Sequence, residues 1–238
     1  MKCHHPAHST LPPMPSGRAS GLVRRLLLTA VVPLLLTACA GTLLPKPTPP
    51  PARFTLDAGT AAPTPTAQVT TADAPALTVD LPRAAPGYDS RRMVYQRRPQ
   101  QLEAFAFHEW VEPPAQMLAP LLVRALQDSG GFRAVLRAPS AAAGGWRLET
   151  ELLRLHQDFS QRPSQVRLSV RAVLLNSSTR QAVAWREFDV SVAAASEDPV
   201  AGAAAAQVAA QQLLTEVAAF CAEQVRAAAA ARTPVRPR

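Results

Sequence analysis

The sequence predicts an α+β domain with a mostly antiparallel sheet and two helices packed on one face. Three observations predict this class. Apolar residues alternate with polar ones in several short runs, as in strands that bury one side. A leucine stripe at helical spacing divides the early runs from the later ones, and a long alanine-rich segment of helical period closes the chain. Strands, helix, strands and helix in this order are typical of helices segregated to one face of an antiparallel sheet.

The early strands are short and irregularly spaced. They are expected at 53–57, at 77–81 (ending before Pro82), and at 93–96 and 104–107, the last two forming a hairpin. The segment 58–75 is rich in Ala, Thr and Pro, a composition typical of a surface loop.

The first helix is expected over residues 114–129. Apolar residues recur there at i, i+3, i+4, i+7 and i+8, and comprise Leu118, Leu121, Leu122, Ala125 and Leu126. Pro113-Pro114 suit its first turn, and Gly130-Gly131 suit a C-terminal cap.

The later strands are longer. They are expected at 132–136, 146–159, 166–174 and 183–192, with a turn at 176–179. The alternation of 146–159 slips at Leu153 and Leu155, which predicts a β-bulge. A second slip is expected near Glu187.

A long helix is expected to begin after Asp198, with Pro199 at its first position, and to run to about residue 230. One side of it is apolar and carries Ala206, Ala210, Leu213, Leu214, Val217, Phe220 and Cys221. We expect the cysteine to be a small core residue.

The N-terminal region has the pattern of a secretion signal. Arg24 and Arg25 precede an uncharged run of 13 residues, 26–38, shorter than the roughly 20 residues that span a bilayer. The run ends in Leu36-Thr37-Ala38-Cys39, which resembles the bacterial lipobox. The resemblance implies diacylglycerol on Cys39 Sγ, cleavage between Ala38 and Cys39, and acylation of the new amine. A short uncleaved anchor or a plain secretory signal remains the alternative.

These features divide the chain into four parts. Residues 1–38 form the signal peptide, and a start at Met14 would give a signal of ordinary length. Residues 39–52 are the lipidated cysteine and a Pro-rich tether of about 40 Å. Residues 53–230 are the α+β domain, and 231–238 are a tail. Ala40 follows the cysteine in place of the aspartate that commonly retains lipoproteins in the inner membrane, which favours an outer-membrane, periplasm-facing anchor.

Composition excludes several classes of function. The formal charge is +8, but four of the 25 basic residues precede Cys39, so 21 remain against 17 acidic residues, a charge of +4. These basic residues are scattered rather than clustered between aromatics, which argues against a nucleic-acid partner. Of the three cysteines, Cys3 would be removed and Cys39 lipidated, leaving Cys221 without a disulfide partner.

The sequence carries no motif that points to catalysis. His108-Glu109-x-x-Glu112 approaches a zinc-protease pattern but ends in Glu, and Pro113-Pro114 forbids the helix that such a site needs. His156 and Asp158 are expected to be a surface pair on one strand. We therefore expect no enzyme, no metal site and no cofactor.

The segment 88–136 resembles the ABC-type transport auxiliary lipoproteins, the PqiC-like family. The matching features are an R-x-x-Y strand at 92–95, Trp110, Pro113-Pro114, the leucine-striped helix, and Gly131-Phe132. The resemblance extends more weakly over 53–230. It implies a non-catalytic component working with a permease, an ATPase and an MCE-type periplasmic protein in the movement of lipids or hydrophobic compounds between membranes.

Candidate partner-binding residues are Tyr95, Arg97, Arg98 and Trp110, since arginine and aromatic residues are enriched at binding hot spots. Core packing is the alternative for Tyr95 and Trp110, and a solvated basic turn for the arginines. A homo-oligomer is also open.

Two other functions remain, an outer-membrane assembly lipoprotein of the lipopolysaccharide-export type and a periplasmic lipid-binding module. A large apolar cavity would favour the lipid-binding module. A filled core with an exposed edge strand would favour the transport component.

Overall fold

The computed structural model describes residues 49–57, 74–140 and 144–232. The chain divides into a unit of residues 1–49 and a unit of residues 50–238, and every element given below belongs to the second. The signal peptide, Cys39 and most of the tether therefore lie outside the described residues. Neither helix in the described ranges combines the length and the hydropathy of a membrane span.

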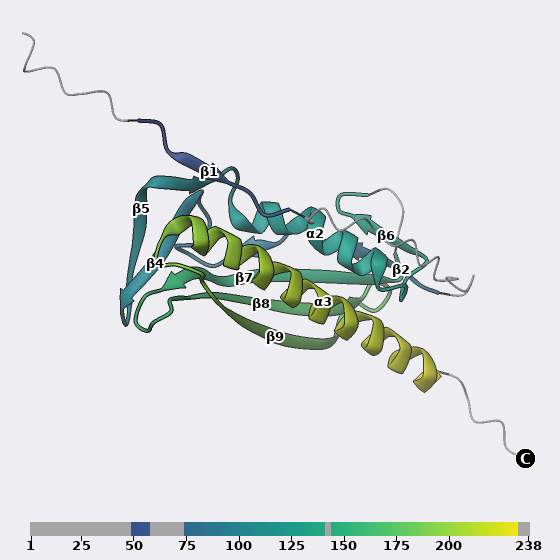
Figure 1. Ribbon diagram of the computed structural model, residues 1–238. Helices are drawn as coiled ribbons and strands as arrows, with labels where there is room; N and C mark the ends of the chain where they lie inside the picture. Colours follow the sequence, from purple (N-terminus) through teal and green to yellow (C-terminus); the bar gives the residue numbers. More distant parts are fainter. Residues whose placement is uncertain (1–48, 58–73, 141–143, 233–238) are drawn as a thin grey trace, which may run out of the picture. The chain divides into compact units, whose positions relative to one another are not determined.

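The order of elements is the expected one, with strands, a helix, more strands and a long helix (Figure 1). The elements are β1 (Ala52–Phe54), β2 (Ala76–Val79), β3 (Arg83–Ala84), β4 (Arg92–Arg98), β5 (Gln101–Trp110), α2 (Pro114–Asp128), β6 (Ala134–Arg137), β7 (Trp146–Asp158), β8 (Gln165–Asn176), β9 (Gln181–Ala193) and α3 (Pro199–Arg232). The α+β class is confirmed.

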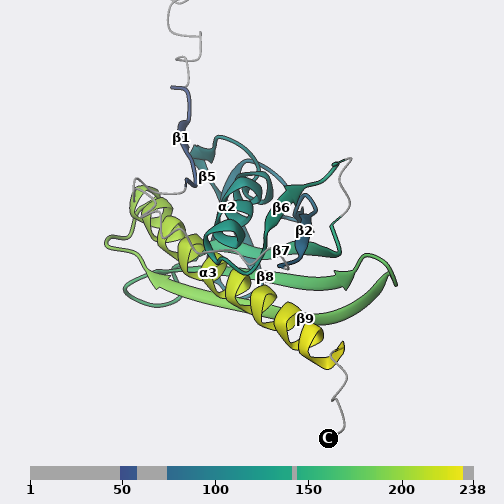
Figure 2. The same cartoon turned by 90° about the vertical axis from the view of Figure 1, so that its right-hand side faces the viewer.

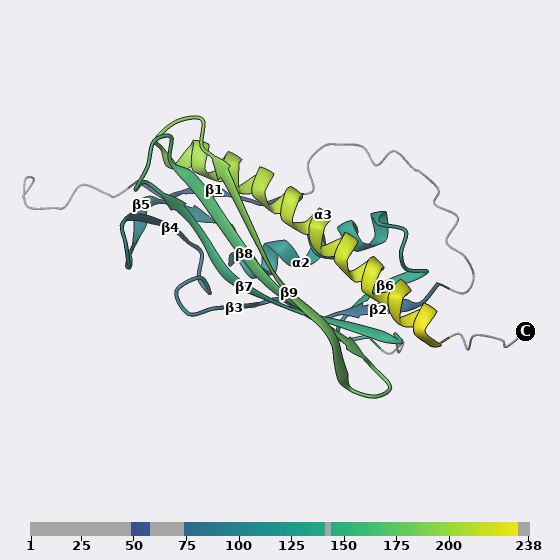
Figure 3. The same ribbon diagram turned by 90° about the horizontal axis from the view of Figure 1, so that it is seen from below.

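Strand β7 organises the sheet because it is paired along both of its sides. On one side it is antiparallel to β8, and β9 is antiparallel to β8 in turn. On its other side three short strands follow one another in parallel, β2 at its start, β3 in its middle and β4 at its end. Strand β6 extends the sheet beyond β2, and β5 and then β1 extend it beyond β4. Most residue pairs are antiparallel, as expected, but the short strands make the sheet mixed (Figure 3).

Two bulges interrupt the ladders. The predicted one in β7 is confirmed, since the register with β8 shifts between Leu152 and Arg154. The one in β9 lies opposite Leu174 and Leu175, so the prediction near Glu187 is wrong. The apolar side chain of Trp185 is 66% exposed, so it does not mark the buried side of the strand.

Both helices begin and end where local chemistry predicts. Pro114 is the first residue of α2, and Gly130 follows its end with φ of 64°, a conformation that glycine adopts without strain. Asp198 Oδ1 accepts hydrogen bonds from the backbone N–H groups of Val200 (2.8 Å) and Ala201 (2.9 Å) at the start of α3.

The two helices pack on one face of the sheet, which confirms the expected layering (Figure 2). The stripe of α2 is only partly as expected, because Leu118, Leu122 and Leu126 are buried whereas Leu121 and Ala125 are partly exposed. The apolar side of α3 is buried as a whole. Its residues include Ala206, Ala210, Leu213, Leu214, Val217, Phe220 and Cys221.

The helices meet closely because their contact residues are small. A Cβ on Gly131, just beyond α2, would lie 2.6 Å from Ala222 Cβ on α3. The space between sheet and helices is filled accordingly. Two internal cavities there measure about 10 Å³ each, which is room for about one water molecule.

Candidate functional site

The sequence-predicted arginines lie at the tip of the β4–β5 hairpin. Arg97 and Arg98 are exposed, and Arg98 pairs with Gln101 across the turn. Gln100 closes this turn with φ of 66°. The hairpin therefore presents two guanidinium groups to solvent at one end of the sheet.

The Tyr95 ring packs under one of these guanidinium groups and is itself held by several contacts. Its hydroxyl donates a 2.8 Å hydrogen bond to Glu103 Oε2, which raises the pKa of Tyr95. Its ring packs against Phe105, with centroids 4.5 Å apart, and against the edge of Phe159 at 5.8 Å. The Arg97 guanidinium lies 5.0 Å from the Tyr95 ring centroid, within cation–π range. Tyr95 thus holds Arg97 in place while being only 8% exposed itself.

Trp110 does not share this surface. Its side chain is 3% exposed and belongs to the core, at the end of β5 away from the hairpin tip. Its backbone N–H donates to the carbonyl of Arg91 at 2.7 Å. The structure therefore brings Tyr95 and Arg97 together. Trp110 is a core residue, which was the alternative interpretation of its role.

The residues of the pattern that approaches a zinc protease lie outside any helix, and its two glutamates form ion pairs with arginines. His108 and Glu109 lie in strand β5 rather than on a helix, and Glu109 pairs with Arg53 at 2.9 Å. Glu112 receives the Arg91 guanidinium at 3.0 Å. Within the described residues, no group of three or more His, Cys, Asp or Glu side chains is arranged to hold a metal ion.

Cys221 lies inside the core, and burial raises its pKa to about 12. Its sulfur is therefore a protonated thiol, which is a poor nucleophile. Ala38 and Cys39, the expected cleavage and lipid-anchor residues, lie outside the described residues.

The prediction of a surface pair at His156 and Asp158 is wrong, because both residues are 5% exposed. The bulge in β7 adds one residue, Leu153, so that both side chains point away from the helices, where an uncovered strand would leave them exposed. They are buried because other parts of the chain cover them on that side. There the loop between β3 and β4 covers His156 with Tyr88, whose hydroxyl lies 3.1 Å from His156 Nδ1.

The environments of these two residues set their charge. Burial, reinforced by the charge of Arg154, lowers the pKa of His156 to about 4, so the ring is neutral at pH 7. Burial acts in the opposite direction on Asp158, but the hydrogen bonds from Ser160 and the Arg167 guanidinium at 2.9 Å outweigh it and lower the pKa of Asp158. Sequence reasoning missed this cluster because Tyr88 is 68 residues from His156.

The side of β7 that carries His156 and Asp158 continues across β8 and β9, where it carries a ladder of ion pairs. We call it the bare face, meaning the side of these strands that carries Arg154, His156, Asp158, Arg167 and Arg171 and lies opposite the helices. Arg171 pairs with Glu187 on β9 at 2.7 Å and with Glu151 on β7 at 3.4 Å. Arg154 pairs with Asp189 on β9 at 4.0 Å.

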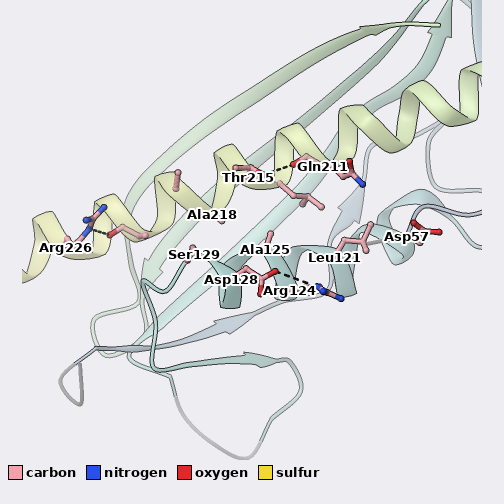
Figure 4. Close-up of a pocket in the computed structure, with 13 residues that line it drawn as sticks. Asp57, Leu121, Arg124, Ala125, Asp128, Ser129, Gln211, Thr215, Ala218 and Arg226 are labelled. Atoms are coloured by element: carbon pink, nitrogen blue, oxygen red, sulfur yellow. Dashed lines mark hydrogen bonds and ion pairs between the residues drawn. The ribbon is translucent and has the colours of Figure 1, made fainter. Parts of the chain in front are cut away.

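A groove of about 500 Å³ runs between the outer sides of α2 and α3 (Figure 4). Its floor is apolar where small side chains of α3, such as Ala218, face Leu121 and Ala125 of α2. Its rim is polar, with Arg124 and Asp128 forming a 3.6 Å ion pair and Arg226 opposite them on α3.

Strand β9 forms an edge of the sheet, since β8 is its one partner among the described strands. It spans 13 residues and carries Trp185 on the bare face. A long edge strand with an exposed aromatic residue is a surface to which another protein chain can add.

Comparisons with known proteins give a consistent result. The family model described as ABC-type transport auxiliary lipoprotein component matches residues 54–218. A crystal structure of protein XCC0632 from Xanthomonas campestris, of the family DUF330, is similar with 27% identity and a TM-score of 0.61, covering 78% of this chain and 93% of that chain. An uncharacterized protein with 16% identity and a TM-score of 0.55, covering 74% and 99% of the two chains, shows the same fold. A search of curated proteins found no match.

Proposed function

Because this chain belongs to the family of ABC-type transport auxiliary lipoprotein components, we propose that it is a non-catalytic docking component of an MCE-linked transport system. In this proposal the chain is anchored through Cys39 to the periplasmic face of the outer membrane. Its partners are an MCE-type periplasmic protein and, through it, a permease and an ATPase. The cargo is a lipid or another hydrophobic compound.

The observation that carries the proposal is a filled core in a chain whose family works in transport. The cavities between sheet and helices measure about 10 Å³ each, far below the volume of a lipid chain. A protein that carried lipid between sheet and helices would need a much larger apolar space. A filled core together with the exposed edge of β9 favours contact with a partner protein over transport of a ligand inside the domain.

The hairpin tip is the surface that we propose for this contact. Arg97 is held over the Tyr95 ring, so less side-chain entropy is lost when a partner binds it. Arg98 extends the charge at the same tip. A guanidinium can bond a partner's carboxylate through two parallel hydrogen bonds, which gives both affinity and orientation.

The anchor restricts the domain to the membrane surface while the tether gives it reach. Confinement raises its effective concentration near a partner in the same envelope. Cys39→Ala should abolish acylation and either release the domain from membranes or leave an uncut precursor. Labelling cells with an alkyne palmitate analogue measures this, and equal labelling of the wild type and Cys39→Ala would contradict the anchor.

The docking proposal is tested by affinity purification of the full-length chain from detergent-solubilised envelopes, followed by mass spectrometry. The double variant Arg97→Glu/Arg98→Glu should lose the MCE protein. Arg133→Glu/Arg137→Glu, which makes the same charge change at exposed positions next to and on β6, should retain it.

Three outcomes separate the alternatives. Equal recovery with both double variants would move the interface away from the hairpin. Recovery of outer-membrane assembly proteins in place of transporter subunits would favour an assembly factor. A lipid bound to the purified chain without any protein partner would favour a lipid-binding module.

A further inference from the structure

A pocket of about 450 Å³ opens on the bare face, beside the buried His156. Its wall is built from four separate parts of the chain, the β3–β4 loop, the β4–β5 hairpin, β7 and β8. The lining residues are Tyr88, Gln96, Gln100, Leu102, Arg154, His156, Asp158 and Arg167. Nearly all of them carry hydrogen-bonding groups, so a ligand here would be polar. The volume lies in the range of small-molecule sites.

The imidazole of His156 has one ring nitrogen left for such a ligand. Its Nδ1 lies 3.1 Å from the Tyr88 hydroxyl, and its other ring nitrogen bonds to no residue that the structure describes. When the hydroxyl donates to Nδ1, the neutral ring carries its proton on Nε2. This nitrogen is not among the buried side-chain atoms of the described residues that lack a partner, so it is open to solvent and can donate to a ligand in the pocket.

The two arginines keep unused donors as well. Arg167 reaches Asp158 through Nε, and the nearest contact of Arg154 with an acid is a 4.0 Å pair with Asp189. Each guanidinium carries five N–H donors, so most of them remain for other contacts. Both side chains are about two-fifths exposed and can reach into the pocket.

The charge of the pocket favours an anion. Among the described residues that line the pocket, Asp158 is the one acidic residue, and Arg167 and the Ser160 backbone N–H already occupy its two oxygens. Asp189 lies 4.0 Å from Arg154 but is 64% exposed and outside the lining, so two arginines face one carboxylate in the pocket and leave it positive. His156 adds no charge at neutral pH. Arginine forks match the oxygens of phosphate and other oxyanions.

We propose that this pocket binds a phosphate group, held by the guanidinium groups of Arg154 and Arg167 and by the imidazole N–H of His156. The phosphate can belong to free inorganic phosphate or to the headgroup of a phospholipid. Arg97 and Arg98, which we propose for the protein partner, do not line this pocket, although Gln100 of the same hairpin turn does. Phosphate binding is measured without the protein partner, so its outcome does not depend on the transport partnership.

The test uses the full-length chain in a detergent without phosphate, titrated with inorganic phosphate. Two quantities are measured, the heat of binding and the His156 ring signals in NMR spectra, which His156→Gln assigns. Bound phosphate should raise the pKa of His156, because an anion offsets the positive charge of Arg154 and Arg167 that opposes protonation. This shift needs no arginine variant, so it remains measurable if such variants fold poorly.

Two matched variants locate the site. Arg154→Gln should weaken phosphate binding by about tenfold, as expected for the loss of charge-assisted hydrogen bonds. Arg171→Gln makes the same change on the same face, outside the pocket, and should alter binding by less than about twofold. Absence of binding heat and of any His156 shift would overturn the proposal, as would equal effects of the two variants.

The source of the phosphate is resolved by two further ligands, dihexanoyl phosphatidylglycerol and dihexanoylglycerol, below their micelle concentrations. Tighter binding of the phospholipid than of inorganic phosphate would support a headgroup site. Equal binding would support recognition of the phosphate alone. Equal binding of dihexanoylglycerol and the phospholipid would overturn the proposal, since the phosphate would then contribute nothing.

Discussion

The two faces of the sheet formed by β7, β8 and β9 differ in burial and in polarity. The face under α2 and α3, which we call the covered face, is apolar and filled, with side chains such as Leu152, Leu168 and Leu174 excluded from solvent. The bare face is lined by arginines and acids that pair with one another across the strands, and it holds the pocket around His156. We infer from this comparison that burial on the covered face supplies most of the stability of the fold. The other face is then free to carry polar groups whose pairing contributes little to folding.

The largest expected effect lies on the covered face. Leu122 is 2% exposed, so Leu122→Ala should lower the free energy of unfolding by about 2 to 5 kcal/mol through lost burial and a residual cavity. Arg124→Ala, on the same helix, removes only the exposed 3.6 Å pair with Asp128 and should cost less than about 1 kcal/mol. Urea denaturation measures both. Equally mild effects would show that α2 is not packed on the sheet.

The next effect is a pH dependence from the buried part of the bare face. The pKa of His156 falls from 6.5 to about 4 on folding, owing to burial and to Arg154 and Arg167, while Asp158 acts in the opposite direction. The unfolded chain therefore binds the proton first. Stability should drop as the pH falls from 6.5 to 4, by about 3 kcal/mol in total.

The comparison for this effect is His156→Gln, which cannot bind the proton in either state. Its free energy of unfolding should change less than that of the wild type between pH 7 and pH 4.5. Urea denaturation at a series of pH values gives both curves. Parallel curves would show that His156 is not buried as described.

A smaller effect is expected in the exposed ladder. Arg171→Gln removes the contacts to Glu187 and Glu151, whose side chains remain in solvent, so the urea midpoint should move much less than in Leu122→Ala. The difference from the wild type should vanish at about 1 M salt, where screening acts over roughly 3 Å. A large effect that persists in salt would mean that the bare face contributes to folding in the way the covered face does.

The smallest effect is expected at the edge strand. Trp185 is 66% exposed, so Trp185→Ser should change the free energy of unfolding by about 0.5 kcal/mol or less. A larger, concentration-dependent loss would mean that another copy of the chain covers this residue in solution. Sedimentation of the wild type and the variant distinguishes these cases.

The covered face was predictable because its signals are local. The stripe with Leu118, Leu122 and Leu126 and the cap at Asp198 each lie within one element, where periodicity and hydrogen-bonding chemistry dictate the structure. The parallel pairings of β2, β3 and β4 with β7 were not predictable. They join short segments far apart in the chain, and nothing in a strand of two to seven residues specifies its neighbour.

The candidate sites also differ in how far the sequence predicts them. Arg97 and Arg98 were placed correctly on a hairpin because two apolar runs flank a turn there. The cluster at His156 was predicted to be on the surface. Its burial depends on a loop that brings Tyr88 over it, after a bulge has changed the face on which it lies. The slip at Leu153 indicates the change of face, but no signal in the sequence indicates the loop that covers His156 there.

Photo-crosslinking from the hairpin tip in living cells tests the central claim, that the surface of the domain and not its interior performs the function. Benzoyl-phenylalanine replaces Arg98 in one strain and Arg137, in β6, in another, both on exposed positions. The account predicts crosslinks from position 98 to an MCE-type protein and none from position 137. No crosslink from position 98, together with a lipid recovered from the purified chain, would contradict it.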